Sequence, residues 1–275
     1  MPFTYYALTD RITMSTLIIA DPHLDVWAAA GRDPLAGLDA AILADLDALI
    51  IAGDLSNDPV QLWPRHLERL AHLVGPGKLH IIPGNHDYYG HVLDDEDTLA
   101  EICISAGGRL AQKSEIIVGR DRVLCCTLWT DFALHGDALI GEMGAQKWMN
   151  DYKQIRGRDD RMISPGDTAA IHRDHLSWLG KALERPFRGR TIVVTHHAPH
   201  PALAASQDAC AQPAYASDLI GFIHRYQPDA WLFGHTHHRS EAMVGNTVVR
   251  NVSFGYPWEV PPGTEVEILQ RGLIS

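Results

Sequence analysis

The chain of 275 residues is 46% hydrophobic and 21% charged, and its formal net charge is −11 with the histidines neutral. Such a length and balance are typical of a globular protein with a sizeable core. The acidic charge argues against a nonspecific nucleic-acid-binding protein, which needs a basic surface, but it allows an anionic substrate wherever bound cations reverse the local potential.

The N-terminal stretch and the cysteines indicate where in the cell the protein is expected. No apolar run reaches the roughly 20 residues that a membrane-spanning helix needs, and the opening stretch MPFTYYALTDRIT is too polar for a secretory signal. The four cysteines match neither a zinc ribbon nor a thioredoxin-like pair. We therefore expect a cytoplasmic protein without a membrane partner, in which residues 1–13 extend a single domain of residues 14–275.

Short apolar runs that end abruptly at polar clusters are the main structural signal. Such runs, rich in Ile and Val, are typical of buried strands. They cover residues 16–20, 48–52, 78–83, 191–195 and 230–233, and they are followed by DPHLD, GDLSND, GNHD, HHAPH and GHTHH. Each polar cluster thus lies at the carboxyl end of a predicted strand, where open α/β sheets bind ligands.

The segments between these strands are helical in pattern. The predicted helices run from Asp33-Pro34 to about Asp47 and over residues 59–74, 94–106, 167–184 and 215–226. Residues 122–129 predict another strand, and the stretch from residue 240 to 269 predicts strands separated by turns. Residues 131–166 fit neither pattern and predict an irregular excursion that faces the substrate.

Each polar cluster has a simple structural explanation when it is taken alone. The Asp21-Pro-His23 and Gly53-Asp54 sequences are common in turns. The pair His196-His197 could be a buried structural pair. His235 and His237 stand two residues apart, so in an extended segment their side chains would point the same way.

Taken together, the clusters supply nitrogen and oxygen donors without a thiolate. The candidate ligands are Asp21, His23, Asp54, Asn85, His196, His235 and His237. Imidazole and carboxylate donors suit divalent or trivalent first-row metal ions such as Mn, Fe or Zn better than Ca, which prefers oxygen alone. The number of donors suits two such ions that share one carboxylate.

The order of the five motifs, spread over residues 21 to 237, resembles the calcineurin-like metallophosphoesterase superfamily. The resemblance implies an α/β fold, a four-layer αββα sandwich of two mixed β-sheets flanked by helices, with a dinuclear metal site at the strand carboxyl ends. It implies that Asp54 bridges the two ions. One ion would be held by Asp21, His23, Asp54 and His237, and the other by Asp54, Asn85, His196 and His235.

At several motif positions the sequence differs from individual branches of this superfamily, which narrows the range of relatives. GDLSND lacks the DRG ending of the serine/threonine protein phosphatases, and Asn57 stands where the purple acid phosphatases have a metal-ligand tyrosine. GNHD has a histidine where the lipid A precursor hydrolases have arginine. The strongest general likeness is to bacterial cyclic-nucleotide and glycerophosphodiester phosphodiesterases.

The resemblance also implies a reaction, the hydrolysis of phosphoester bonds by a metal-bridging hydroxide, with phosphodiesters favoured. His86 would contact the phosphate or protonate the leaving alkoxide while Asp87 orients its ring; alternatively, His86 only fixes the loop. Asn85 and His197 are the candidate substrate-binding residues, although His197 could instead support a ligand. Asp25 could accept a hydrogen bond from a ligand histidine or cap a loop. Residues that could form a substrate wall are Trp129, Asp131, Asn150 and Tyr152.

Three other functions compete with phosphodiester hydrolysis. A phosphomonoesterase acting on a small metabolite is the nearest, because the same site can catalyse both reactions. A metal-stabilised binding protein without activity is disfavoured because it would be expected to lack part of the site. The acidic charge disfavours a DNA-repair nuclease, so we expect a small phosphorylated substrate and no nucleic-acid partner.

Overall fold

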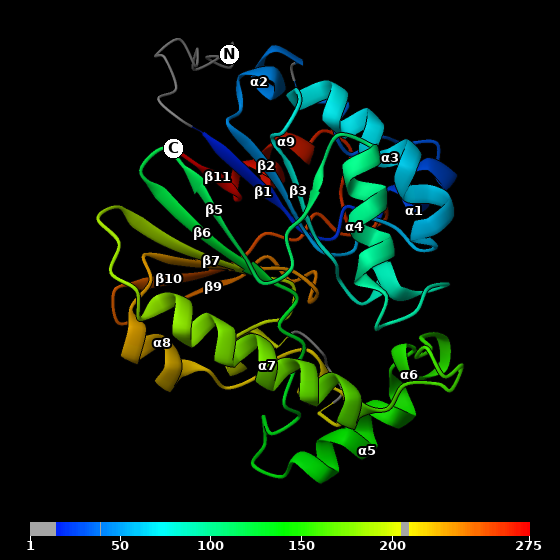
Figure 1. Ribbon diagram of the computed structural model, residues 1–275, viewed down its shortest axis with the longest axis vertical. Coiled ribbons are helices and arrows are strands. Elements are labelled where there is room, and N and C mark those ends of the chain that lie inside the picture. Colours follow the sequence, from blue (N-terminus) through cyan, green and yellow to red (C-terminus); the bar gives the residue numbers. More distant parts are fainter. Residues whose placement is uncertain (1–14, 39, 205–208) are drawn as a thin grey trace.

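Two β-sheets lie face to face between two layers of helices (Figure 1). The structure is a computed structural model that describes residues 15–38, 40–204 and 209–275. The first sheet has five strands in the order β11 (Leu273–Ile274), β1 (Thr16–Ile19), β2 (Ala48–Ala52), β3 (Leu79–Ile82) and β4 (Arg109–Leu110). The second has six in the order β5 (Ser114–Val118), β6 (Asp121–Cys126), β7 (Arg190–Thr195), β8 (Ala230–Phe233), β10 (Thr247–Asn251) and β9 (Glu241–Val244).

Both sheets are parallel in the middle and antiparallel at an edge. Strands β1 to β4 run parallel, and β11 pairs with β1 in the opposite direction. In the second sheet β6, β7, β8 and β10 run parallel, with β5 and β9 antiparallel at the two edges. The parallel direction brings the carboxyl ends of the central strands to a common edge of each sheet, as the sequence predicts.

Successive side chains along each strand point to opposite faces of the sheet, which divides the core into three apolar layers. In β1, Ile18 faces the second sheet while Leu17 faces the helices outside the first sheet. In β7, Val194 faces the first sheet while Val193 faces the outer helices of the second. Because successive side chains of a strand point to opposite faces, an unbroken apolar run is needed to bury both faces at once.

Helices cover both outer faces of the paired sheets (Figure 1). Over the first sheet lie α1 (Leu24–Ala29), α2 (Ala40–Asp45), α3 (Pro59–Val74), α4 (Glu96–Ser105) and α9 (Glu265–Gln270). Over the second sheet lie α7 (Pro165–Leu183) and α8 (Ile220–Tyr226). This arrangement confirms the predicted sandwich of two mixed sheets flanked by helices.

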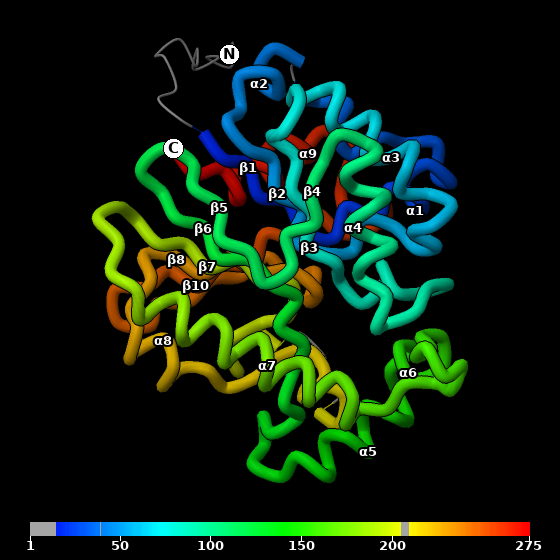
Figure 2. The backbone as a smooth tube through the Cα atoms, in the orientation of Figure 1, coloured from blue at the N-terminus to red at the C-terminus, as the bar shows by residue number. Residues whose placement is uncertain are grey.

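The excursion between β6 and α7 is not irregular, and that part of the prediction is wrong. It forms α5 (Ala138–Trp148) and the short α6 (Asp151–Gln154), which lie together at one end of α7 (Figure 2). Gly141 and Gly144 lower the helix propensity of α5. Both are needed, because a Cβ at either position would collide with a backbone carbonyl, that of Phe132 or of Cys210.

Two other local predictions are also wrong. The helix expected from Asp33 to Asp47 is reduced to α2, and residues 34–37 form turns although Asp33 Oδ1 accepts a hydrogen bond from Leu35 N at 3.1 Å, as a helix N-cap would. Residues 265–270 form helix α9 rather than a strand, since a short apolar run fits either pattern and packing decides between them. Ile268 and Leu269 are buried on the helical side of the first sheet.

Two further predictions concern the membrane and the N-terminal stretch. Within the described residues, none of the helices has the length and apolar character needed to cross a membrane. The predicted extension over residues 1–13 lies outside the described part of the chain.

Candidate active site

The predicted ligand residues come together at the carboxyl ends of five strands. Asp21 and His23 follow β1, Asp54 follows β2, Asn85 follows β3, His196 follows β7, and His235 and His237 follow β8. The two sheets are joined at this edge by the bridge between Ala20 and Ser253. Segments that are far apart in the sequence therefore contribute to one buried polar cluster.

The turns that carry these ligands depend on glycine. A Cβ at Gly53 would collide with the ring of His196, and a Cβ at Gly84 would collide with the carboxylate of Asp54. A Cβ at Gly234 would lie 2.6 Å from Asp21 Oδ2. The glycines before Asp54, Asn85 and His235 thus allow the ligand side chains to approach the backbone.

Most of the candidate ligands have left-handed backbone conformations. The φ angles are 54° at Asp21, 37° at His23, 57° at Asp54, 63° at His235 and 50° at His237. Such conformations are uncommon for residues other than glycine and cluster at functional sites, where the surrounding structure holds them in place. They turn the chain sharply after each strand, so that side chains from neighbouring strands meet.

One half of the cluster consists of Asp21, His23 and His237, whose ligand atoms all lie within 4.8 Å of one another. The Nε2 atoms of His23 and His237 are 3.2 Å apart. His237 Nε2 also lies 3.4 Å from Asp21 Oδ1. These are the residues expected to hold one ion together with Asp54.

The other half consists of Asp54, His196 and His235, which also meet within 4.8 Å, with Asn85 beside them. His196 Nε2 lies 3.4 Å from Asp54 Oδ1 and 3.0 Å from Asn85 Oδ1. The second oxygen of Asp54 lies 3.7 Å from His23 Nε2 in the first half. Asp54 therefore presents one oxygen to each half, as a bridging carboxylate does.

Hydrogen bonds on the far sides of the rings aim the imidazoles. His196 Nδ1 lies 3.0 Å from the Ala52 carbonyl oxygen, and His237 Nδ1 lies 2.8 Å from Glu259 Oε2. When Nδ1 donates to such an acceptor, the Nε2 lone pair faces the cluster, which is the usual arrangement of histidine ligands. No local motif marks Glu259, which follows His237 only after 22 residues.

The pKa shifts of Asp54, His23 and His235 fit bound cations. The pKa of His237, by contrast, is lowered by burial but raised overall to about 9 by Asp21 and Glu259. Burial raises the pKa of the Asp54 carboxyl well above its ordinary value, and the carboxylates of Asp21 and Asp87 raise it further. Burial lowers the pKa values of His23 and His235 well below their ordinary range, so both are neutral, as metal ligation requires. His235 Nε2 is buried and has no hydrogen-bond partner.

An unpaired imidazole nitrogen beside a buried carboxylate is the arrangement that a first-row metal ion would satisfy. The four cysteines lie outside the cluster. The residues present thus fit two ions held by nitrogen and oxygen atoms.

His86 is positioned by Asn57, and the expectation that Asp87 orients its ring is wrong. His86 Nδ1 lies 2.9 Å from Asn57 Oδ1, and Asn57 Nδ2 donates to Asp25 Oδ2 at 3.1 Å. Since the Asn57 amide points its NH₂ group at Asp25, its oxygen accepts from His86 Nδ1–H. Asp25 therefore acts on His86 through Asn57 and not on a ligand histidine.

Asp87 lies beneath the ligand loops. Its carboxylate accepts hydrogen bonds from the backbone N–H groups of Asp54 at 2.7 Å and Gly84 at 2.8 Å, and from Trp63 Nε1 at 3.2 Å. Burial raises the pKa of Asp87 to about 7, against the effect of these donors. Asp87 thus ties the loop after β2 to the loop after β3.

A cleft of about 350 Å³ opens onto the cluster. Tyr89, Trp148, Tyr215 and Tyr256 provide aromatic walls, and the other lining residues include Asn85, His86 and Asn150. The sequence alone does not mark these aromatic residues, because they come from different loops and from α5. The tyrosines pack on site histidines, with ring centroids 4.4 Å apart for Tyr256 and His23.

Several residues predicted to face the substrate lie elsewhere. His197 is buried and packs on His235, with ring centroids 4.2 Å apart, and it does not line the cleft. Of the four predicted wall residues, Asn150 lines the cleft, whereas Trp129 packs behind His197 and Tyr152 is buried. Asp131 uses its carboxylate to accept from Ala133 N at 3.1 Å.

Comparisons with known proteins agree with this geometry. Residues 14–239 match the calcineurin-like phosphoesterase family, and the chain belongs to that family. An uncharacterized protein of Acanthamoeba polyphaga mimivirus is 23% identical over 235 residues, which are 78% of this chain and 80% of that protein. The structure of a phosphopantetheinyl hydrolase from Mycobacterium tuberculosis is similar in fold, with a TM-score of 0.68 at 16% identity over 89% of this chain and 90% of that one.

Membership of this family makes the chain a metal-dependent phosphoester hydrolase in general terms. The converging His and Asp side chains at the strand ends are its candidate metal ligands.

Proposed function

We propose that the chain hydrolyses small phosphodiesters with the help of two first-row metal ions, Mn, Fe or Zn. The observation that supports this most directly is the convergence of two ligand clusters on the two oxygens of Asp54. When bound, such ions activate water and neutralise phosphate charge. Asp21, His23, Asp54 and His237 would hold one ion, and Asp54, Asn85, His196 and His235 the other.

The other residues around this centre orient the candidate ligands or act on the substrate. Glu259 and the Ala52 carbonyl hold the rings of His237 and His196 in the orientation for ligation. His86 lines the cleft with Nδ1 already paired, so its Nε2 is the atom free to meet the substrate. In the proposed reaction His86 protonates the leaving alkoxide at this atom.

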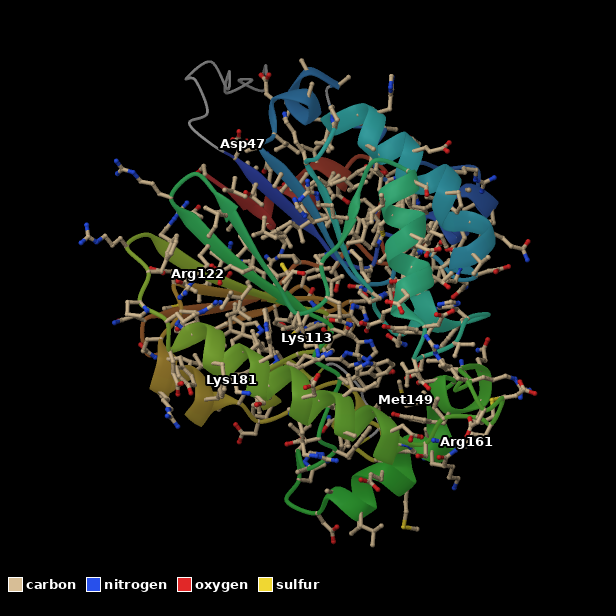
Figure 3. All side chains as sticks on the ribbon, viewed as in Figure 1. Asp47, Lys113, Arg122, Met149, Arg161 and Lys181 are labelled. Carbon is tan, nitrogen blue, oxygen red and sulfur yellow. The ribbon has the colours of Figure 1, made fainter. Side chains whose placement is uncertain are left out.

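The charge of the cleft supports a diester over a monoester. Neither Lys nor Arg is among the residues that line the cleft within the described part of the chain, and Glu259 adds a carboxylate. Of the cationic side chains labelled in Figure 3, Lys113 and Arg161 form ion pairs on the surface, and Arg122 donates to oxygens away from the cleft. A monoanionic diester needs less compensating charge than a dianionic monoester.

A substrate panel tests this preference. With manganese added, we expect kcat/KM for bis(4-nitrophenyl) phosphate to exceed that for 4-nitrophenyl phosphate by about tenfold or more, a difference of about 1.4 kcal/mol in transition-state stabilisation. The two esters share a leaving group and differ in the charge on phosphorus and in the second nitrophenyl group of the diester. A preference for the monoester would instead make the chain a phosphomonoesterase, and inactivity toward both with both metals bound would favour a binding protein.

A further inference from the structure

Asp151 is a buried carboxylate that the proposed reaction does not yet use. It is the first residue of α6, in the excursion, and only 2% of its surface is exposed. Its Oδ1 accepts hydrogen bonds from Asn85 Nδ2 at 2.9 Å and from the Tyr89 hydroxyl at 2.6 Å. One oxygen of the excursion thus contacts both a candidate metal ligand and a wall of the cleft.

The contact with Asn85 decides which end of the amide faces the metal centre. An asparagine side chain has an oxygen that can bind a cation and an NH₂ group that cannot. An ionised carboxylate only accepts hydrogen bonds, so the NH₂ group of Asn85 must face Asp151. The amide oxygen then points the other way, where it lies 3.0 Å from His196 Nε2.

Through its contact with Tyr89, Asp151 also fixes a residue that lines the cleft. The ring of Tyr89 lies against that of His86, with centroids 4.4 Å apart. By accepting from the Tyr89 hydroxyl, Asp151 fixes the ring that packs on His86. Asp151 therefore touches neither the predicted metals nor the substrate directly, and it acts through its neighbours.

We propose that Asp151 is a positioning residue that orients Asn85 for one of the two metal ions and so links the excursion to the metal centre. This inference rests on the proposed function, because it assumes that Asn85 is a ligand. It also changes the expected role of the excursion, since shortening it through α6 would weaken metal binding as well as alter the substrate-facing wall.

The test measures metal affinity rather than activity. Metal-free full-length chain is titrated with Mn²⁺, and free Mn²⁺ is followed by electron paramagnetic resonance. Asp151→Leu removes the acceptor, and we expect one ion to bind about 10–100-fold more weakly, the usual effect of losing a partner of a metal ligand. The other ion should keep its affinity within a few fold.

Asp151→Asn is the conservative comparison. Both hydrogen bonds end on Oδ1, so an asparagine can retain them through its own amide oxygen. We expect this variant to bind both ions nearly as the unchanged chain does. Lys153→Ala, an exposed position on the same helix, is the matched control and should change neither affinity.

Three results would overturn the proposal: unchanged binding of both ions in Asp151→Leu, an equal loss at both sites, or equal losses in the Leu and Asn variants. The last would show that the charge matters and not the orientation. If Asp151→Leu does not fold, Asp151→Ala provides the same comparison. Failure of the unchanged chain to bind two ions would count against the proposed function instead.

Discussion

Asp54→Ala is expected to weaken the binding of both metal ions by more than about 100-fold. Losing a residue that only hydrogen-bonds to a metal ligand weakens binding by up to about 100-fold, and this variant removes a candidate ligand itself. The reason is geometric, because Oδ1 lies 3.4 Å from His196 Nε2 in one half of the centre and Oδ2 lies 3.7 Å from His23 Nε2 in the other. Titration with Mn²⁺ by calorimetry measures the effect, and hydrolysis should be lost in parallel.

His23→Ala is the matched comparison for this experiment. His23 belongs to only one of the two halves, so one ion should be weakened far more than the other. Circular dichroism shows whether both variants keep the fold. An Asp54→Ala variant that still binds one ion with unchanged affinity would show that Asp54 belongs to a single site and does not bridge.

His86→Asn is expected to reduce kcat/KM toward an alkyl phosphodiester by about 10²–10⁴-fold, the usual contribution of general acid–base catalysis. The loss should be smaller toward a nitrophenyl diester, because nitrophenolate leaves readily without a proton whereas an alkoxide does not. Burial, together with the nearby His196 and His237, lowers the pKa of His86 to about 4. Above that pH the free enzyme holds a neutral ring, so we expect the negative charge of the bound phosphate to help His86 take up the proton it transfers.

The metal content of the His86 variant distinguishes the remaining roles. The His86 ring is near the centre, since one of its nitrogens lies within 4.8 Å of ligand atoms of His23 and Asp54. Equal losses on both substrates with both ions retained would mean that His86 only positions the phosphate. Loss of one ion would mean that His86 is itself a ligand or supports one.

The strands and the convergence of the candidate ligands could be predicted from the sequence because both signals are local. An apolar run such as residues 48–52 is typical of a central strand buried on both faces, and Asp54 follows it after Gly53. Parallel strands place Asp54 at one edge of the first sheet and His196 and His235 at one edge of the second, and the face-to-face packing of the two sheets brings these edges together. The short motifs contain the chemistry and the glycines that the turns require.

The partners of the ligands could not be predicted in the same way. Glu259 and Asp151 reach His237 and Asn85 from segments that have no distinctive motif, and only the folded chain shows the contacts. The family resemblance implies that Asp87 orients the ring of His86, its neighbour in the sequence. The short 3-10 turn over His86–Tyr88 instead directs the Asp87 carboxylate beneath the loops, toward backbone N–H groups.

The most direct test of the dinuclear centre is the metal content of the chain purified without chelators. Elemental analysis by inductively coupled plasma mass spectrometry should find two first-row ions per chain, Mn, Fe, Zn or a mixture, or the chain should take up two when they are supplied. The convergence of both ligand clusters on Asp54 predicts this stoichiometry. A chain that binds at most one ion, even with these metals in excess, would contradict it.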